Sequence, residues 1–400
     1  MPFVLYVLAL AIFAQGTSEF MLAGLVPDIA ADLGVSVGAA GGLTSAFAVG
    51  MIVGAPLMAV LAMRWPRRLA LLAFLVAFLL THVVGAVTTS YPVLLASRVV
   101  AALANAGFLA VALAAATALV AADAKGRATS VLLGGVTLAC VAGVPGGALL
   151  GQLWGWRSAF WAVALVSVPA VVAVVRSVPG GAADSAGAGG ARGELRALRR
   201  PRLLLMLALG ALVNGATFCT FTYLAPLATE VAGLGDGWVP ALLALFGLGS
   251  FLGVTLAGRV ADRRPTPLLV GGGLALLAGW TTLALAAGTP AVVVPLALVQ
   301  GALSFAVGST LIARALYEAP EAPRLGGGFA TAALNVGAAL GPWAGGLTID
   351  AGHGYRSAPA VSATLLALAL GLTAAALAAS RPRRSTGRGP SPAPATTGRD

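Results

Sequence analysis

Long apolar segments separated by short polar connections make up most of this 400-residue chain. A membrane-spanning helix needs about 20 mostly apolar residues, and segments of that length recur along the chain. They lack the alternation of apolar and polar residues in a transmembrane β-strand, so the pattern predicts an all-α fold. We place twelve helices, with boundaries good to a few residues, at 4–26, 38–61, 69–88, 92–121, 128–151, 157–176, 203–226, 238–258, 268–288, 291–313, 326–348 and 358–379.

The composition agrees with burial in a bilayer. Hydrophobic residues form 59% of the chain and charged residues only 9%, whereas soluble proteins carry roughly 25% charged residues. A chain with so little polar surface cannot cover itself in water. We therefore expect an integral membrane protein surrounded by lipid.

A linker divides the predicted helices into two sets of six. The stretch from Ser177 to Pro201 is rich in Gly, Ala and Ser and then in Arg, which is typical of a flexible connection. The tail beyond Arg381 has a composition typical of disorder. The predicted domains are an N-terminal six-helix bundle over 1–176, a cytoplasmic linker over 177–201, a C-terminal six-helix bundle over 202–380 and a disordered cytoplasmic tail over 381–400.

The basic residues predict the orientation of the chain. Cytoplasmic loops of membrane proteins carry an excess of Lys and Arg. If the N-terminus is cytoplasmic, every basic residue except Arg98, Arg157 and Arg356 falls on the cytoplasmic side. Topology therefore explains the net charge of +11 better than nucleic-acid binding does. We expect a multi-pass protein of the cell membrane with both termini in the cytoplasm.

An internal repeat relates the two halves. The motif from Phe47 to Gly54 matches the motif from Phe246 to Gly253, and the same offset aligns Pro66 with Pro265. Membrane transporters with parallel repeats have two bundles related by an axis along the membrane normal, and their cargo site lies near the midplane. The repeat therefore predicts two six-helix bundles related by such a pseudo-two-fold axis.

Glu19 is the main candidate for chemistry. It lies well inside the first apolar segment, where a carboxylate usually marks a transport pathway or a proton relay. A low-dielectric environment favours the protonated carboxyl, so Glu19 is expected to bind and release a proton. Arg98 lies at a similar depth in the fourth segment and is its expected partner. Gln15, one turn before Glu19 on the same face, is a candidate for substrate binding. A purely structural pairing of Glu19, for example with Gln15, remains the alternative.

Other intramembrane polar residues are candidates for contact with a small molecule. Asn105 lies two turns beyond Arg98 on the same face. Gln300 and Asn335 are also candidates, although interhelical hydrogen bonding explains either one. His82 is interpreted as a packing histidine rather than a proton relay. One face of the seventh segment mixes polar and aromatic side chains, as sites for drug-sized ligands do: Asn214, Thr217, Phe218 and Phe221.

Small residues recur every four positions in the fifth segment. Such a stripe lets a second helix approach closely, and Pro145 beside it removes a backbone hydrogen bond and permits a bend. The eleventh segment repeats the pattern beside Pro342. We expect both faces to serve packing and gating. The stripe in the fifth segment consists of Gly135, Ala139, Gly143, Gly147 and Gly151, and that in the eleventh of Ala333, Gly337, Gly341 and Gly345.

These motifs resemble those of the major facilitator superfamily, in its drug:proton antiporter branch. Arg98 resembles the helix-4 arginine that is associated with proton coupling in that branch. The run from Gly258 to Arg264, which includes Asp262 and Arg263, resembles the superfamily's cytoplasmic loop signature. The corresponding first-half loop departs from the signature and lacks its acid. The exporters' helix-5 motif is matched by Gly143, Pro145, Gly146, Gly147 and Gly151.

Within that branch, the chain is similar to the chloramphenicol-resistance exporters of the arabinose-efflux-like group. The similarity lies in the runs Gly16–Phe20, Ser97–Phe108 and Gly155–Trp161. It implies proton-coupled export of chloramphenicol or a similar small amphipathic drug by alternating access. We also expect a monomer that is driven by the proton gradient and needs no cofactor. Export of a sugar or a nucleoside is the alternative.

Sequence features of other function classes are missing. The sequence contains no nucleotide-binding glycine loop, metal-ligand cluster or nucleophile triad, so neither an enzyme nor an ATP-driven pump is expected. Cys140 and Cys219 lie in apolar segments and form neither a metal spacing nor a disulfide framework. A non-transporting membrane sensor is the least favoured alternative, because no stretch outside the predicted helices is long enough for a folded output domain.

Overall fold

The computed structural model describes residues 2–62, 65–118, 120, 125–178, 195–260, 265–319 and 326–379, and this part of the chain is almost entirely helical. The elements of the N-terminal half are α1 (Phe3–Phe20), η1 (Met21–Gly24), α2 (Val26–Leu33), α3 (Val37–Ala62), α4 (Arg67–Val87), α5 (Tyr91–Ala118), α6 (Lys125–Leu138), η3 (Ala139–Gly143), α7 (Val144–Trp154) and α8 (Arg157–Ser177).

The C-terminal half follows the same plan. Its elements are η4 (Leu195–Arg199), α10 (Pro201–Thr222), α11 (Leu224–Pro226), η5 (Leu227–Val231), α12 (Trp238–Val260), α13 (Pro265–Ala286), α14 (Pro290–Glu318), α15 (Gly326–Thr348), η6 (Ile349–His353) and α16 (Ser357–Ala379). Most of the predicted linker and the whole predicted tail lie outside the described residues.

Among the described residues, eleven helical segments are long and apolar enough to cross a membrane. They correspond to eleven of the twelve predicted helices. The twelfth is α15, which is as long as the others and contains many glycines together with Asn335 and Pro342. It packs against α10 and α3 like a spanning helix. The prediction of an all-α, multi-pass membrane fold is therefore confirmed.

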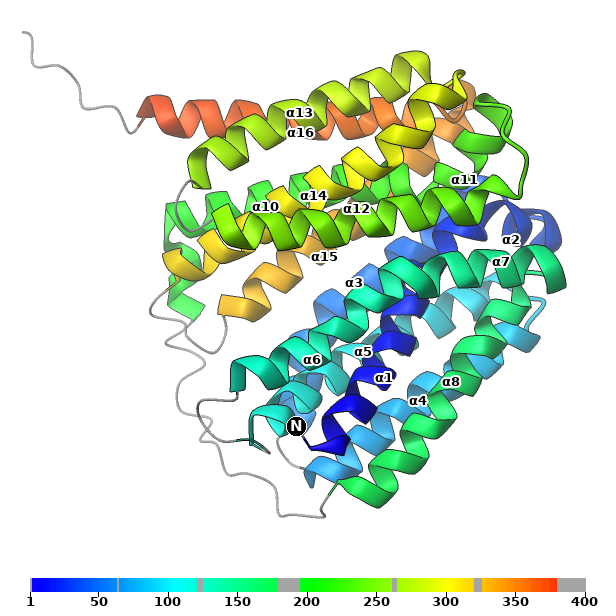
Figure 1. The fold of residues 1–400 in the computed structure, drawn as a ribbon, viewed down its shortest axis with the longest axis vertical. Coiled ribbons are helices and arrows are strands. Elements are labelled where there is room, and N and C mark those ends of the chain that lie inside the picture. The colour runs from blue at the N-terminus through cyan, green and yellow to red at the C-terminus, as the bar shows by residue number, and fades with distance from the viewer. Residues whose placement is uncertain are drawn as a thin grey trace, which may run out of the picture.

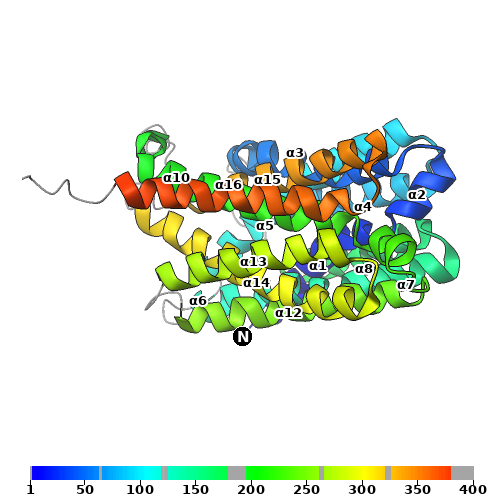
Figure 2. The same ribbon diagram turned by 90° about the horizontal axis from the view of Figure 1, so that it is seen from above.

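The helices form two bundles, α1–α8 and α10–α16 (Figures 1 and 2). The bundles touch through α3 against α15 and through η3 and α7 against α12. In Figure 1 they meet at the end that carries α2 and α11 and diverge toward the end that carries the N-terminus. The contacts that join the halves therefore gather at one end of the molecule.

The first predicted helix is shorter than its apolar segment. The α-helix ends at Phe20, a 3-10 turn covers Met21–Gly24, and α2 begins at Val26. Pro27 lacks the N–H that a continuous helix would use to bond the carbonyl of Ala23, so a straight helix is disfavoured here. The break follows directly after Glu19 and Phe20, which places both side chains at the end of a helix.

The stripe of small residues in the fifth segment packs against α1 of the same half. A Cβ added to Gly135 would clash with the carbonyl oxygen of Ala9, and one added to Gly143 would clash with a side chain of α1. The eleventh segment repeats this arrangement, because a Cβ on Gly337 would clash with the carbonyl oxygen of Ala211 on α10. Each stripe therefore serves close packing within its own bundle.

The internal repeat extends from the sequence to the packing. Gly50 of α3 lies against the carbonyl oxygen of Val99 on α5, and Gly249 of α12 lies against the carbonyl oxygen of Leu298 on α14. Both members of the second pair follow those of the first by the offset seen in the sequence. The two halves thus use equivalent glycines at equivalent helix crossings, as two repeated bundles should.

A carboxylate joins the two halves at the closed end of the molecule. Asp350, in the turn after α15, accepts hydrogen bonds from Ser36 Oγ at 2.7 Å and from the backbone N–H of Gly38 at 3.1 Å. Both donors lie at the N-terminus of α3, where a negative charge is favoured by the helix dipole. At the same end, the Gln152 amide donates to the carbonyl oxygen of Asp236 in the other half.

This contact predicts a cross-link between the halves. A short bifunctional thiol reagent should join Ser36→Cys to Asp350→Cys in a chain whose Cys140 and Cys219 are replaced by alanine. A protease site inserted in the linker then allows the measurement, because linked halves stay together on a denaturing gel after cleavage. Ser36→Cys paired with Gly258→Cys, at the far end of α12, is the control and should not link. If both cysteine pairs gave two separate halves on the gel, the close contact between Ser36 and Asp350 would be contradicted.

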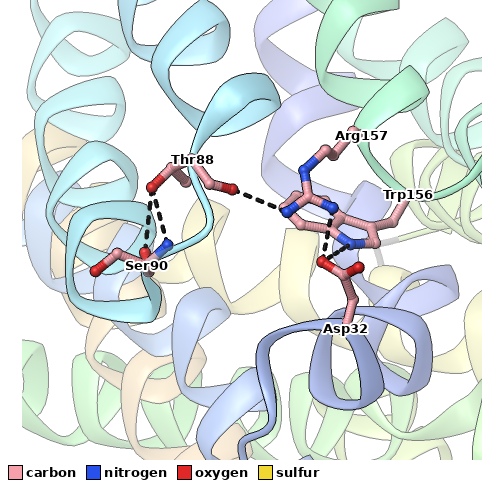
Figure 3. Close-up of polar contacts among 5 residues, drawn as sticks. All are labelled: Asp32, Thr88, Ser90, Trp156 and Arg157. Carbon is pink, nitrogen blue, oxygen red and sulfur yellow. Dashed lines mark hydrogen bonds and ion pairs between the residues drawn. The ribbon is translucent and has the colours of Figure 1, made fainter.

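A second polar cluster fixes α2 to the start of α8 (Figure 3). The Arg157 guanidinium donates to Asp32 Oδ2 at 2.6 Å and to the carbonyl oxygen of Thr88 at 2.9 Å. The Trp156 indole N–H donates to the same Asp32 oxygen at 3.3 Å. The hydrogen bond from Arg157 holds the pKa of the Asp32 carboxyl below its ordinary value. The cluster thus ties α2 to the α4–α5 connection and to α8.

The lowered pKa of Asp32 predicts how stability depends on pH. The stabilisation is fully present above the unfolded-state pKa of about 3.9 and is lost as the pH falls through the lower folded-state value. Asp32→Asn should therefore lower the thermal midpoint in detergent by the same small amount from pH 5 to pH 8, because exposed ion pairs contribute about 0–1 kcal/mol. Arg356→Gln, at the equivalent position of the other half, is the control and should change less, since the hydrogen bond of Arg356 among the described residues is a 3.4 Å bond to the carbonyl oxygen of Leu285. If the decrease in the thermal midpoint varied between pH 5 and pH 8, the lowered pKa assigned to Asp32 would be contradicted.

Candidate functional site

An aromatic cavity lies between the two bundles. The empty space inside it, counted out to its opening and including open solvent, is about 310 Å³. The N-terminal half contributes Phe20, Cys140 and Val144. The C-terminal half contributes Thr217, Phe218, Phe221, Leu243, Phe246, Gly247, Ser250 and Phe305.

Five phenylalanine rings run through this cavity from one bundle to the other. Phe20 of α1 lies 5.6 Å from Phe218 of α10, measured between ring centroids, and Phe218 lies 6.1 Å from Phe221. Phe221 and Phe246 approach to 4.6 Å, and Phe246 lies 6.4 Å from Phe305. Rings at these separations attract one another and offer edges and faces to an aromatic ligand. Phe20 is the link through which α1 contacts the other bundle.

Three of the four residues predicted on the seventh segment line the cavity, namely Thr217, Phe218 and Phe221. The fourth, Asn214, instead donates to the carbonyl oxygen of Leu334 on α15 at 2.7 Å. Asn335 is placed similarly, because its amide donates to the carbonyl oxygen of Thr331 on its own helix at 3.0 Å. Hydrogen bonding between and within helices accounts for these two asparagines.

Gln300 belongs to a second cavity, which lies entirely within the C-terminal bundle. This cavity has a volume of about 250 Å³ out to its opening and shares Phe221 and Phe246 with the first. The Gln300 amide donates to the carbonyl oxygen of Leu276 at 3.1 Å. Its Oε1 atom and the indole N–H of Trp280 both lie buried without a hydrogen-bond partner among the described residues. The two cavities are thus separated by the Phe221–Phe246 pair.

Glu19 and Arg98 lie close enough to interact electrostatically, but they do not form the direct pair expected from the sequence. Within the described part of the chain, no ion pair or hydrogen bond joins them. Arg98 instead donates to Ser18 through both terminal nitrogens, to Oγ at 2.8 Å and to the backbone oxygen at 2.7 Å. Glu19 also interacts electrostatically with Cys140, which lines the aromatic cavity. The carboxyl therefore lies near both the buried guanidinium and a residue of the cavity wall.

Gln15 lies one turn before Glu19 on α1 but makes no bond to it. The side chain is 1% exposed, and neither atom of its amide has a hydrogen-bond partner among the described residues. Asn105 is also buried and donates to Met51 Sδ at 3.6 Å. A hydrogen bond from Gln15 to Glu19 is therefore absent from the described contacts.

His82 is a packing histidine, as expected, but it is also part of the Arg98 site. Its ring lies 4.2 Å from the Phe78 ring and 5.8 Å from the Phe160 ring. Its Nε2 atom lies 2.6 Å from Ser18 Oγ, the hydroxyl that also binds Arg98. Helices α1, α4 and α5 thus meet at one serine. This junction was not predictable from the sequence, because no local pattern places Ser18 beside His82.

The expected gating motifs are partly described. The helix-5 motif begins at Gly143, the last residue of the π-helical turn η3, and Pro145 is the second residue of α7. Gly147 and Gly151 pack on η1 and the residue after it, whereas a Cβ on Gly146 or Gly258 would meet open space. Asp262 and Arg263 lie outside the described residues. The described residues contain no cluster of three or more side chains suited to a metal ion.

Three of the five rings of the aromatic cavity were not predicted from the sequence. Phe20, Phe246 and Phe305 were not singled out as lining residues, although Phe246 begins the repeated motif of the eighth segment. Phenylalanine is common in spanning helices, so composition alone does not separate a cavity ring from a lipid-facing one. The cavity depends on which faces of α1, α12 and α14 turn toward the centre.

Two membrane-spanning bundles with a repeated plan and a cavity between them define a secondary transporter architecture. The chain belongs to the Major Facilitator Superfamily, whose family model matches residues 8–324 and 241–398. It is 60% identical over 355 residues to a chloramphenicol resistance protein of Streptomyces lividans, covering 88% of this chain and 90% of that protein. It is 32% identical over 361 residues to a chloramphenicol efflux pump of Mycobacterium tuberculosis, covering 86% of each chain.

Solved structures agree with the fold. A bacterial homologue of the human lysosomal transporter Spinster, in an inward-facing and occupied conformation, matches with a TM-score of 0.77 at 18% sequence identity. The match covers 94% of this chain and 96% of the other. The same homologue in its unoccupied inward-facing conformation matches with a TM-score of 0.76. The two-bundle fold is thus shared across nearly the whole chain.

The unpaired amide of Gln15 predicts an unusual response to mutation. A buried polar group without a partner costs about 1–3 kcal/mol, so Gln15→Leu, which has a similar size, should raise the thermal midpoint in detergent. Gln300→Leu is the matched control and should gain less, because it also loses the bond to Leu276. A lower midpoint for Gln15→Leu would show that the amide is satisfied in the folded protein.

Proposed function

We propose that this chain exports chloramphenicol, or a similar small amphipathic drug, in exchange for protons. The observation that carries the proposal is the aromatic cavity between the bundles, in a chain 60% identical to a chloramphenicol resistance protein. Chloramphenicol combines an aromatic ring with an amide and hydroxyl groups. The phenylalanine rings suit its ring, and Thr217 and Ser250 supply hydroxyl groups beside them.

The proposed energy source is the proton gradient, with no cofactor and no ATP. Glu19 is the proposed proton carrier, since an ionisable residue within a spanning helix is most often functional. Proton release leaves a carboxylate beside Arg98, and proton uptake removes that charge. Glu19 lies near Cys140 of the cavity wall, so we infer that its charge acts on a molecule bound in the cavity. A neutral drug thus couples to the proton through the shape and charge of the site.

The proposed setting is a monomer in the cell membrane with both termini in the cytoplasm. In this orientation, the end closed by Asp350 and Ser36 faces outward, and the diverging end faces the cytoplasm. Transport by alternating access then requires the Asp350 contact to break while the opposite end closes. Rocking of two bundles about a central site is the usual motion in transporters built from repeats.

A sugar or nucleoside exporter is the alternative, and the cavity lining argues against it. Such cargo needs several hydrogen-bonding side chains, because each buried polar group left unpaired is costly. Of the lining residues, only Thr217, Ser250 and Cys140 carry a polar side-chain group. The lining therefore favours an apolar, aromatic cargo.

Drug accumulation in cells tests the proposal. Cells that express the chain should accumulate less chloramphenicol than cells without it, and a protonophore should abolish the difference. Glu19→Gln keeps the size of the side chain but cannot ionise, so it should remove the effect at unchanged membrane levels. The readout is radiolabelled chloramphenicol retained per cell, with and without the protonophore.

Glu230→Gln is the matched control, because Glu230 is an exposed carboxylate in η5. It should export as the wild type does. Unchanged accumulation in wild-type cells would reject chloramphenicol as the cargo and direct the screen to sugars and nucleosides. Full export by Glu19→Gln would reject Glu19 as the proton carrier, whatever the cargo.

A further inference from the structure

Ser18 is the meeting point of a buried hydrogen-bond chain from three helices. Ser18 of α1, His82 of α4 and Arg98 of α5 are each at most 1% exposed. Arg98 donates to Ser18 Oγ at 2.8 Å and to the Ser18 backbone oxygen at 2.7 Å. His82 Nε2 lies 2.6 Å from the same Oγ, and His82 Nδ1 lies 2.7 Å from the carbonyl oxygen of Phe78. Both ring nitrogens of His82 therefore have a hydrogen-bond partner.

The partners fix where the hydrogens lie. A carbonyl oxygen only accepts, so His82 Nδ1 must carry the hydrogen that points to Phe78. Ser18 Oγ accepts from Arg98 and has one hydrogen of its own, which it donates to His82 Nε2. His82 is therefore neutral and acts as an acceptor. A second hydrogen on Nε2 would place another cation beside Arg98 and would deprive the Ser18 hydroxyl of its acceptor.

The hydrogen bonds among Ser18, His82 and Arg98 hold the Arg98 guanidinium away from the carboxyl of Glu19. The Arg98 guanidinium carbon lies 4.5 Å from the centroid of the Phe47 ring, and both terminal nitrogens are occupied by Ser18. Arg98 Nε has no hydrogen-bond partner among the described residues. Arg98 thus bonds the residue that precedes Glu19 on α1. It is close enough to Glu19 to act on it electrostatically, but its hydrogen bonds go to Ser18.

We infer that Ser18 and His82 are positioning residues that hold Arg98 off Glu19 and so set the pH at which Glu19 exchanges its proton. The inference rests on the proposed role of Glu19 in proton exchange. A guanidinium in direct contact stabilises an ionised carboxylate strongly, and a carboxylate so bound does not take up a proton near neutral pH. Keeping Arg98 on Ser18 leaves Glu19 able to do so.

Among the described residues, few titratable or charged groups face the hydrogen bonds of Ser18, His82 and Arg98. Glu19 of α1 and Arg98 of α5 carry the charges, and η3 contributes the Cys140 thiol, which interacts electrostatically with Glu19. Helix α8 contributes the Phe160 ring, and α4 itself contributes the Phe78 ring. Any change in the pH dependence on altering Ser18 or His82 therefore passes through the Glu19–Arg98 pair.

A different role, in which His82 itself carries a proton, makes the opposite prediction for one variant. The Oε1 atom of a glutamine at position 82 can accept the Ser18 hydrogen as His82 Nε2 does, but an amide does not titrate. His82→Gln should therefore keep the wild-type behaviour if the histidine only positions Ser18. It should behave like His82→Leu if protonation of the histidine is required.

The experiment uses the full chain in lipid and two readouts. The first is an infrared titration of the protonated-carboxyl band of Glu19, assigned by its loss in Glu19→Gln. The second is the pH profile of chloramphenicol-driven proton movement in vesicles. Ser18→Ala and His82→Leu should shift both midpoints to lower pH by about one unit or more, since an opposite charge at close range has an effect of about 1–3 units. The KM for chloramphenicol should change little.

Control variants make each outcome decisive. His353→Gln changes the only other histidine of the chain, which is exposed, and should match the wild type. Equal midpoints for wild type and Ser18→Ala would overturn the inference, and so would a His82→Gln variant that behaves like His82→Leu. If wild type moves no protons with chloramphenicol, the proposed cargo fails, while the infrared titration still decides the role of Ser18 and His82.

Discussion

Helices in a bilayer gain little from the hydrophobic effect when they pack together, so they must be held by close contact and by internal hydrogen bonds. In this chain, glycine faces supply the close contact. Gly135 lets α1 approach the fifth helix, Gly337 does the same for α10, and Gly50 and Gly249 repeat one crossing in both halves. Without these faces, the backbones would stand apart and the polar side chains between them would lose their partners. The positions of Ser18, Arg98 and the cavity rings all depend on this packing.

The contacts between the halves differ from those within them. Inside each bundle, glycines lie against backbone atoms over long helix crossings, which leaves little room for movement. Between the bundles, the described polar contacts gather at one end, around Asp350 and Gln152. Near the centre, Gly247 of α12 also lies against the carbonyl oxygen of Cys140 in the other half, beside the aromatic rings. The proposed alternating access requires the polar contacts at the one end to break.

Much of the fold was predictable because it depends on local composition. Twelve apolar segments, a linker and a repeat are visible in the sequence, and the glycine stripes correctly indicated close helix packing. The break after Phe20 was missed, although Pro27 signals it. The site was predictable only in part: Thr217, Phe218 and Phe221 line the cavity, but the expected Glu19–Arg98 pair is replaced by a bond to Ser18. The bond depends on whether Ser18 or Glu19 faces α5. That is decided by the rotation of α1 about its own axis, which is set by the packing of the whole bundle.

The last turn of α1 connects three environments through three consecutive residues. Successive side chains of an α-helix point about 100° apart, so Ser18, Glu19 and Phe20 face different neighbours. Ser18 holds the buried arginine, and Phe20 contacts Phe218 of the other bundle. Glu19 lies between them. A cargo that displaces the Phe20 ring therefore acts on the same helical turn that sets the distance from Arg98 to Glu19. In the proposed mechanism, an uncharged drug and a proton influence one another without touching, because both act on one short piece of backbone.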